Sequence, residues 1–384
     1  MQTPEAKNSD TTPIGQGEFQ RLIREKMSLA VRLMLISVLE DEAEEWVGAR
    51  RYERSATRKD QRIGTRTRDL GTSVGQIKDL PVPRTRGGFQ TQLFEKYQRR
   101  QGELDQMIGD MFVQGVSQAR VGTILETLNG VRPSASTVSR VFHTLEEEYE
   151  QWKQRELPER YAYVFADGTY FSVIYGDEGQ KTPVLALFGI RPDGKREVIA
   201  ITIGQSESKD AWGNVLDDIK SRGVKQVDLW VTDGNQTMID AIRQRYPDSQ
   251  RQRCVKHKLG NVLAHVPEKH HDVVGKEFMA IFYQKNREKA DQQAAAFRQK
   301  YRAVYAEAIA CMDRDWEACL TFYGFPEAHW VRIRTTNVIE RLFLEVKKRS
   351  KKMAAAFRNE SSCMLLFYAV VRSLTFQNVR MDRR

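Results

Sequence analysis

The 384-residue sequence has little of the features that mark secreted or membrane proteins. Its N-terminal residues lack the charged and apolar regions of a signal peptide. The most apolar N-terminal run, residues 29–39, is interrupted by Arg32 and is too short to span a bilayer. Only four cysteines occur, without the even spacing of a disulfide framework: Cys254, Cys311, Cys319 and Cys363. We therefore expect a protein of the reducing cytoplasm, without a membrane partner.

Acidic residues are also in deficit, and the deficit is local. The chain has 61 Lys and Arg against 51 Asp and Glu. Residues 50–100 hold 14 basic and 5 acidic residues, and residues 341–358 hold 7 basic and 1 acidic. Binding of such segments to nucleic acid is favourable because it releases counterions from the phosphates. For either segment alone, a solvated basic face is the alternative. Together they predict that the partner is a nucleic acid.

The N-terminal part is predicted to be a disordered tail over residues 1–17 and a DNA-binding region over residues 18–100. Apolar residues at helical spacing predict a long helix over residues 18–48. Residues 50–90 are rich in arginine and glycine and contain Pro81 and Pro83, which favours irregular or short-stranded structure.

Residues 101–158 are predicted to form a helix-turn-helix domain. Three apolar faces succeed one another, and Ser134 or Ser136 is placed to cap the third helix. The first turns of that helix would present four polar side chains to base edges: Ser136, Thr137, Ser139 and Arg140. The connection at residues 129–133 is longer than the usual tight turn, and a plain helical bundle is the alternative.

The remaining residues, 159–384, alternate between strand and helix patterns and predict an α/β domain. We expect strands over residues 162–175, 182–190, 197–203, 226–232 and 251–255, with helices over 210–222 and 235–245. Residues 258–330 read as largely helical with no obvious place in the sheet. Two more helices are predicted over residues 335–352 and 363–376.

Three acidic residues stand in contexts that suit a metal-binding carboxylate. Asp167 lies in an apolar strand, and Asp233 closes another that is expected to be its neighbour. Glu340 follows Asp233 by 107 residues, on an amphipathic helix. A pair of Mg²⁺ ions, which Mn²⁺ can replace, would serve phosphoryl transfer there. Because both aspartates precede glycine, ordinary turn residues are the alternative.

The helix of Glu340 offers one rival and one supporting residue. Glu345 is the rival carboxylate, about 140° around the helix, so the two cannot point into one site. Lys347 lies two turns from Glu340 on the same face, where a cation would contact a phosphate.

Several motifs resemble, in order and spacing, the Mutator-type bacterial insertion-sequence transposases. They are Asp167-Gly-Thr-Tyr-Phe, Val231-Thr-Asp233-Gly, Cys254-Val-Lys-His257, Arg334-Thr-Thr-Asn337-Val-Ile-Glu340-Arg341 and, near the N-terminus, Val82-Pro-Arg84-Thr-Arg86. The resemblance implies a ribonuclease H-like core with a DDE triad of Asp167, Asp233 and Glu340, interrupted by a helical insertion at about residues 258–330. It also implies that the N-terminal region binds the terminal inverted repeats of the element, and that the partners are double-stranded DNA of these repeats and of the target.

Further residues are assigned beside the triad. Support of the active site is expected from Cys254, His257, Asn337, Arg341 and Lys347, since zinc at Cys254 and His257 would lack a full ligand set. DNA contacts are expected from Arg84, Arg86, Arg334 and Lys348. Two element ends must be handled together, which favours a homodimer or a higher assembly. A DNA-binding regulator with structural carboxylates and a simple nuclease are the alternative functions.

Overall fold

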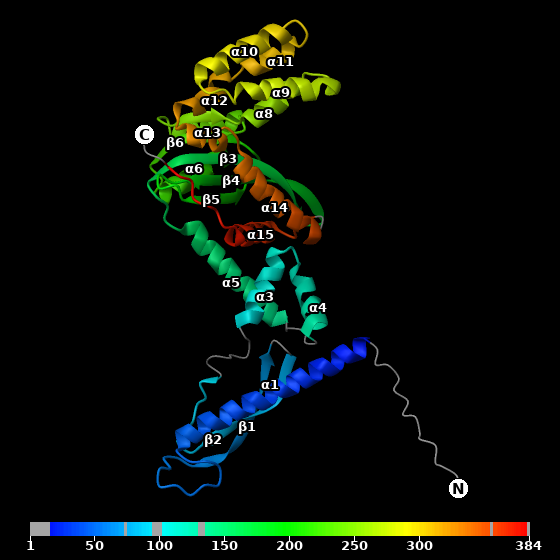
Figure 1. Ribbon diagram of the computed structural model, residues 1–384, viewed down its shortest axis with the longest axis vertical. Helices are drawn as coiled ribbons and strands as arrows, with labels where there is room; N and C mark the ends of the chain where they lie inside the picture. Colours follow the sequence, from blue (N-terminus) through cyan, green and yellow to red (C-terminus); the bar gives the residue numbers. More distant parts are fainter. Residues whose placement is uncertain (1–15, 73–74, 94–101, 130–134, 354–355, 382–384) are drawn as a thin grey trace, which may run out of the picture. The chain divides into compact units, whose positions relative to one another are not determined.

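The computed structural model describes residues 16–72, 75–93, 102–129, 135–353 and 356–381 (Figure 1). The chain divides into two compact units. The first comprises residues 1–111 and 118–142, and the second comprises residues 112–117 and 143–384. The predicted tail at residues 1–17 lies almost entirely outside the described residues.

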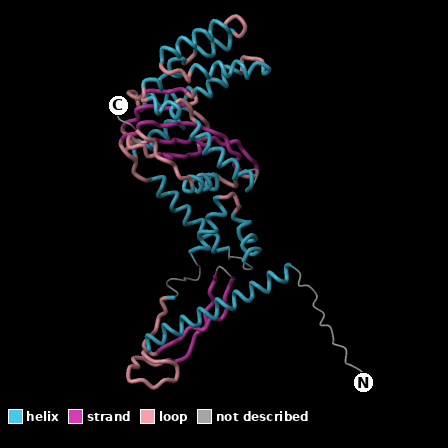
Figure 2. Tube along the Cα trace, viewed as in Figure 1, coloured by secondary structure: helices cyan, strands magenta, loops and turns pink. Residues whose placement is uncertain are grey.

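The first unit contains the helix α1 (Gln16–Val47) and an antiparallel hairpin of β1 (Arg62–Thr72) and β2 (Gly75–Thr85), visible in Figure 2. The long helix predicted over residues 18–48 is therefore confirmed. One side of α1 packs on the hairpin through a small buried cluster: Leu35, Leu39, Leu70, Ile77, Leu80, Val82 and Leu93.

The prediction of irregular or short-stranded structure for residues 50–90 is confirmed at 50–61 and 86–90, but it is wrong between them, because each strand of the hairpin has 11 residues. Pro81 and Pro83 lie within β2, opposite Thr67 and Thr65. Each strand of a two-stranded sheet has a free edge, so a proline can occupy it without removing a ladder hydrogen bond.

Three helices follow where the apolar faces predict them. They are α3 (Gly102–Val113), α4 (Gln118–Asn129) and α5 (Ala135–Gln154). Most of the predicted connection between the second and third helices, residues 130–134, lies outside the described residues.

The second unit is built on a five-stranded sheet with the order β5-β4-β3-β6-β7. The strands are β3 (Arg160–Tyr175), β4 (Glu178–Ile190), β5 (Arg196–Ile203), β6 (Gln226–Thr232) and β7 (Gln250–Arg253). Short turns join β3 to β4 and β4 to β5, so these pairs are antiparallel. The helices α6 (Lys209–Ser221) and α7 (Gln236–Arg245) cross over to β6 and β7, which makes β3-β6 and β6-β7 parallel. The α/β arrangement is as predicted.

Helices cover both faces of this sheet. On one face, Trp212 of α6 and Met238 of α7 pack with Val164, Leu185 and Trp230 of the strands. On the other face lie α14 (Asn337–Met353) and α15 (Glu360–Ser373), which Figure 1 shows together. Phe171 of β3 stacks edge-on against Phe367 of α15 with ring centroids 5.0 Å apart.

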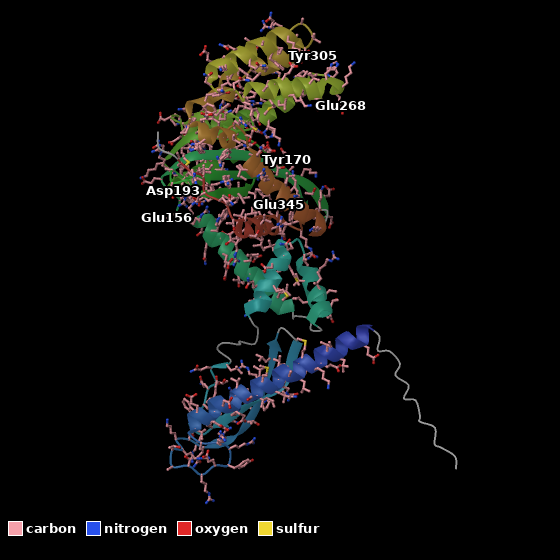
Figure 3. All side chains as sticks on the ribbon, in the orientation of Figure 1. Glu156, Tyr170, Asp193, Glu268, Tyr305 and Glu345 are labelled. Carbon is pink, nitrogen blue, oxygen red and sulfur yellow. The ribbon has the colours of Figure 1, made fainter. Side chains whose placement is uncertain are left out.

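The segment between β7 and α14 is helical, as predicted for residues 258–330. It runs from α8 (Val255–Leu263) through α9 (His271–Ile281), α10 (Arg287–Tyr301), α11 (Ala306–Asp313) and α12 (Trp316–Leu320) to α13 (Glu327–Ile333). Figure 3 labels Glu268 and Tyr305 on this segment, away from the sheet. Among the described residues, no helix combines the length and the apolar character that crossing a membrane requires.

Candidate active site

The register of two parallel strands places the predicted aspartates side by side. Ala166 of β3 pairs with Thr232 of β6, and this is the last pair between the two strands. The next residue on each strand is Asp167 and Asp233, so their backbones lie level in strands that are about 4.8 Å apart. The strand β3 continues to Tyr175 against β4 alone, so Asp167 does not close a strand as Asp233 does.

Asp167 is almost completely buried, with 6% of its surface exposed. Burial and the nearby charge of Asp233 raise the pKa of the Asp167 carboxyl group to about 7. The charge of His257 acts in the opposite direction but does not outweigh them. The backbone N–H of Gly168 donates to Asp167 Oδ1 at 2.8 Å. A cation bound here would stabilise the ionised form of Asp167, because it would replace the lost hydration and offset the charge of Asp233.

Glu340 reaches the same place from the first turn of α14. The backbone N–H of Glu340 donates to the carbonyl of Thr336, and Thr336 Oγ1 lies 3.2 Å from Glu340 Oε1. Lys256 Nζ donates to Glu340 Oε2 at 2.5 Å. The charge of Glu340 also acts to raise the pKa of Asp167, although it is a smaller cause than burial and Asp233.

The rival carboxylate belongs to a different part of the helix surface. Glu345, labelled in Figure 3, accepts hydrogen bonds from Arg349 at 2.5 Å and from Lys348 at 3.0 Å. These bonds lower the pKa of Glu345, and its charge is not among those that act most on Asp167. Glu345 is thus paired with cations of its own helix, whereas Glu340 is bonded to Thr336 near the end of β6.

Cys254 and His257 connect the sheet to the third carboxylate. The backbone N–H of Cys254 donates to the carbonyl of Thr232 at 2.7 Å, directly before Asp233. The buried Thr336 Oγ1 lies 3.4 Å from Cys254 Sγ and 3.3 Å from His257 Nδ1. Ligand atoms of Cys254, His257 and Glu340 lie within 4.8 Å of one another.

The same contacts tune the titration of the thiol and the imidazole. A hydrogen bond with Cys254 is the main cause that raises the pKa of His257 to about 9. Burial acts to raise the pKa of the Cys254 thiol, but the hydrogen bond and charge of His257 outweigh it and the net shift is downward. The thiol and the imidazole therefore favour each other's charged forms, and the charges of Asp167 and Asp233 also raise the pKa of His257.

Lys347 also reaches the site from α14. Its Nζ donates to Thr169 Oγ1 at 2.6 Å, and Thr169 is two residues from Asp167 and therefore on the same face of β3. Burial is the main cause that lowers the pKa of Lys347, against the attraction of Asp167. The predicted placement two turns from Glu340 thus brings this cation beside the aspartates.

A fourth carboxylate, Glu207, lies at the site and was not predicted. Asn235 joins it to the triad, because its backbone N–H donates to Asp233 Oδ1 at 2.9 Å and its Nδ2 donates to Glu207 Oε2 at 3.2 Å. A Cβ atom on Gly168 would lie only 3.0 Å from Glu207 Oε1. Burial and the charge of Asp233 raise the pKa of Glu207. In the sequence Glu207 stands in a polar run before α6. The only sign of a close neighbour there is the glycine that follows Asp167.

The other residues expected around the triad fall into two groups. Asn337 is exposed, and its Oδ1 accepts from Lys256 Nζ at 3.3 Å. Arg341 and Lys348 are exposed and line a groove together with Arg196 and Arg332.

The expectation that Arg334 contacts DNA is contradicted, because only 5% of its surface is exposed. Its Nη1 donates to the carbonyl of Phe282 at 2.9 Å, and its guanidinium lies 3.8 Å from the ring centroid of Tyr283. Arg334 therefore ties the helical segment to the start of α14.

In the first unit, Arg84 and Arg86 are exposed at the end of the hairpin. Ser139 and Arg140 are exposed on α5, and Arg140 Nη2 lies 2.5 Å from Asp105 Oδ2 of α3. Ser136 and Thr137 lie on α5, but their side chains are outside the described part of the structure.

Comparison with known proteins identifies the class. The profile of the family described as "Transposase, Mutator family" matches residues 10–379. The transposase of insertion sequence element ISRM5 from Rhizobium meliloti is 34% identical over 88% of this chain and 85% of its own length. The transposase of IS256 in transposon Tn4001 from Staphylococcus aureus is 32% identical over 88% of this chain and 87% of its own. The chain belongs to the Mutator family of insertion-sequence transposases.

The burial of Asp167 leads to a prediction about stability. Its pKa of about 7 in the folded protein exceeds the ordinary value of 3.8, so folding becomes less favourable as pH rises through this interval. Asp167→Asn removes that dependence. We expect the variant to melt a few degrees above the unmodified protein at pH 8 in a chelating buffer, with the difference disappearing towards pH 4.

The control is Asp228→Asn, which removes a carboxylate bonded to Arg160 on the same sheet. This variant should gain nothing at pH 8. Equal melting temperatures of Asp167→Asn and the unmodified protein at pH 8 would contradict the raised pKa.

Proposed function

We propose that the protein is a DNA transposase that binds the terminal inverted repeats of an insertion sequence and catalyses DNA cleavage and strand transfer. Asp167, Asp233 and Glu340 are its catalytic carboxylates, on a core of the ribonuclease H-like type. The observation that carries the proposal is their convergence from three elements: β3, the end of β6 and the first turn of α14.

The donor set fits divalent magnesium. Asp167 and Asp233 offer hard oxygen ligands side by side, and Glu340 offers a third, which suits Mg²⁺ and its substitute Mn²⁺. Two such ions, when bound, would activate the attacking oxygen and stabilise the leaving oxygen in phosphoryl transfer. The raised pKa of Asp167 supports this assignment, because a buried carboxylate next to a second carboxylate is costly without a cation.

The cations of the chain have a separate task, which is to hold the phosphates. Lys347 lies beside Asp167 through Thr169, where it would orient the scissile phosphate. Arg341, Lys348, Arg196 and Arg332 line the adjoining groove and would bind the flanking backbone of the DNA. Positioning by such fixed charges is a large part of catalysis of phosphoryl transfer.

The first unit would recognise the element ends. Arg84 and Arg86 extend from the hairpin, and Ser139 and Arg140 are exposed on α5, the helix that we assign as the recognition helix of a helix-turn-helix. Phosphate contacts by the arginines would supply affinity, and contacts from α5 to base edges would supply specificity. Two ends brought together imply at least two copies of the chain.

The reaction is tested with a supercoiled plasmid that carries the inverted repeats flanking the gene, in Mg²⁺ or Mn²⁺. We expect 3′-end cleavage and strand-transfer products from the unmodified protein. Asp233→Ala and Glu340→Gln should reduce both by at least about 1,000-fold, since each removes a ligand of the ions. Binding of the repeats should be unchanged.

Glu345→Gln is the matched control, because it alters a carboxylate on the same helix that bonds to Arg349 and Lys348 instead. It should retain cleavage within a few-fold. Cleavage retained in Asp233→Ala, or lost in Glu345→Gln but not in Glu340→Gln, would refute the triad. Binding of the repeats without any metal-dependent cleavage would indicate a regulator, and cleavage without joined products would indicate a nuclease.

DNA binding by the hairpin gives an independent prediction. The double variant Arg84→Ala and Arg86→Ala should bind the repeats more weakly, and the slope of log K against log salt concentration should fall by about 2. Fluorescence anisotropy at several salt concentrations measures both quantities. Lys225→Ala with Lys276→Ala, two exposed cations of the second unit, serves as the comparison and should leave the slope unchanged. An unchanged slope in the Arg84 and Arg86 variant would exclude them from the DNA contact.

A further inference from the structure

The loop that joins α1 to β1 holds a tyrosine in an unfavourable backbone conformation. The backbone N–H of Glu53 donates to the carbonyl of Arg50 at 3.2 Å, so residues 50–53 form a turn. Tyr52 occupies the third position of this turn with a φ of 64°. That left-handed conformation favours glycine or asparagine and costs free energy in a tyrosine. Strained residues of this kind gather at functional sites, where a side chain is needed at one particular place.

The ring of Tyr52 is not packed on the protein. Tyr52 has 90% of its surface exposed, and the next of the described large apolar side chains is Met34 at 68%. Because an aromatic ring stabilises a fold mainly through its burial, packing does not explain the position of this one. The guanidinium of Arg51 lies 5.6 Å from the ring centroid. The loop therefore presents an aromatic surface and a cation together to the solvent.

Hydrogen bonds hold the loop in this conformation. Glu53 Oε2 accepts from the backbone N–H of Arg50 at 2.8 Å, and the carbonyl of Glu53 accepts from Arg58 Nη2 at 2.6 Å. Further along, Thr57 Oγ1 donates to the carbonyl of Gly48 at 2.9 Å. The turn is thus tied to the end of α1 before any ligand is bound. A ring held in this way loses little conformational entropy on binding.

A basic pocket of about 710 Å³ opens beside the ring, between the loop and the hairpin. Tyr52 lines it together with four arginines: Arg51, Arg54, Arg58 and Arg62. Within the described part of the chain, the first three of these arginines are exposed and form no ion pair with a carboxylate. The two acidic residues of the lining are engaged, since Glu40 is bonded to Arg62 and Glu53 to the backbone of Arg50. Exposed arginines of this kind suit phosphate oxygens.

We infer that Tyr52 is a stacking contact for DNA, inserted against the bases at one step of the terminal inverted repeat. The exposed arginines beside it would hold the phosphates of that step. Wedge side chains unstack the base step that they enter, and pyrimidine–purine steps unstack most readily. The ligand of this loop is thus a duplex with a deformable step at the place where the ring enters. The inference rests on the proposed function, because that function requires the repeats to be bound.

Fluorescence anisotropy with a labelled duplex of the inverted repeat tests the stacking on the full chain. We expect Tyr52→Ala to weaken binding by about tenfold or more, because a base–aromatic contact is lost. The slope of log K against log salt concentration should stay unchanged, since no cation is removed. Tyr52→Phe keeps the ring and should bind within a few-fold of the unmodified protein. Met34→Ala is the matched control, an exposed apolar residue of the same unit, and should bind as the unmodified protein does.

Tyr52→Gly separates a loss of function from a loss of folding. Glycine adopts a positive φ without strain, so this variant should melt at or above the temperature of the unmodified protein. It should nevertheless bind the repeat as weakly as Tyr52→Ala. A tyrosine with a merely structural role would give the opposite result, a lower melting temperature with unchanged affinity.

A fluorescent base locates the contact. Duplexes in which 2-aminopurine replaces one adenine at a time report local unstacking through their fluorescence. With the unmodified protein we expect a change at one step of the repeat. The change should persist with Tyr52→Phe and disappear with Tyr52→Ala at saturating protein.

Three results would overturn the inference. They are equal affinities of Tyr52→Ala and the unmodified protein, a salt slope that falls in Tyr52→Ala, and 2-aminopurine signals that are the same with and without the ring. An unmodified chain that does not bind the repeats, or binds them without cleavage, would instead count against the proposed function. The two can therefore fail separately.

Discussion

The parallel pairing of β3 with β6 is the constraint on which the site depends. Its last pair, Ala166 with Thr232, sets Asp167 and Asp233 level on neighbouring strands. A slip of one residue would turn the side chains of one strand to the opposite face. Trp230 and Val231 are fully buried on opposite faces, so such a slip would remove each of them from the core against which it packs. The core that stabilises the sheet therefore also fixes the distance between the two carboxylates.

The third carboxylate is held by a chain of contacts that begins at the same strand end. Thr232 accepts from the backbone of Cys254, Cys254 Sγ contacts Thr336, and Thr336 caps the turn that carries Glu340. The helical segment leaves the sheet at Cys254 and returns at Arg334, whose carbonyl accepts from Val255 at 3.0 Å. Because the segment is closed at its base, the separation of 107 positions between Asp233 and Glu340 does not loosen the site.

The sequence predicted the strands and helices that depend on local periodicity. It did not predict the positions of side chains that depend on tertiary contacts. The strand around Asp167 and the helix of Glu340 follow from apolar spacing. Arg334 was read as a surface cation, but it is buried beneath Tyr283 because it closes the helical segment. Glu207 was missed because its proximity to Gly168 arises from the turn before α6, which leaves no periodic signal. The Cys254 and His257 motif indicated the neighbourhood of the site but not the bridging role of Thr336.

The helix α14 presents two chemistries on adjoining stripes. Glu340 and Lys347, seven residues apart, face the aspartates, whereas Arg341 and Lys348, one residue further on, line the basic groove. Glu345 belongs to the second stripe, where it is paired with Arg349 and Lys348 and partly neutralises that surface. In the proposed transposase, one rigid helix therefore sets the position of the third metal ligand relative to the bound DNA backbone. A rotation of α14 would displace both together, which couples alignment of the DNA to assembly of the triad.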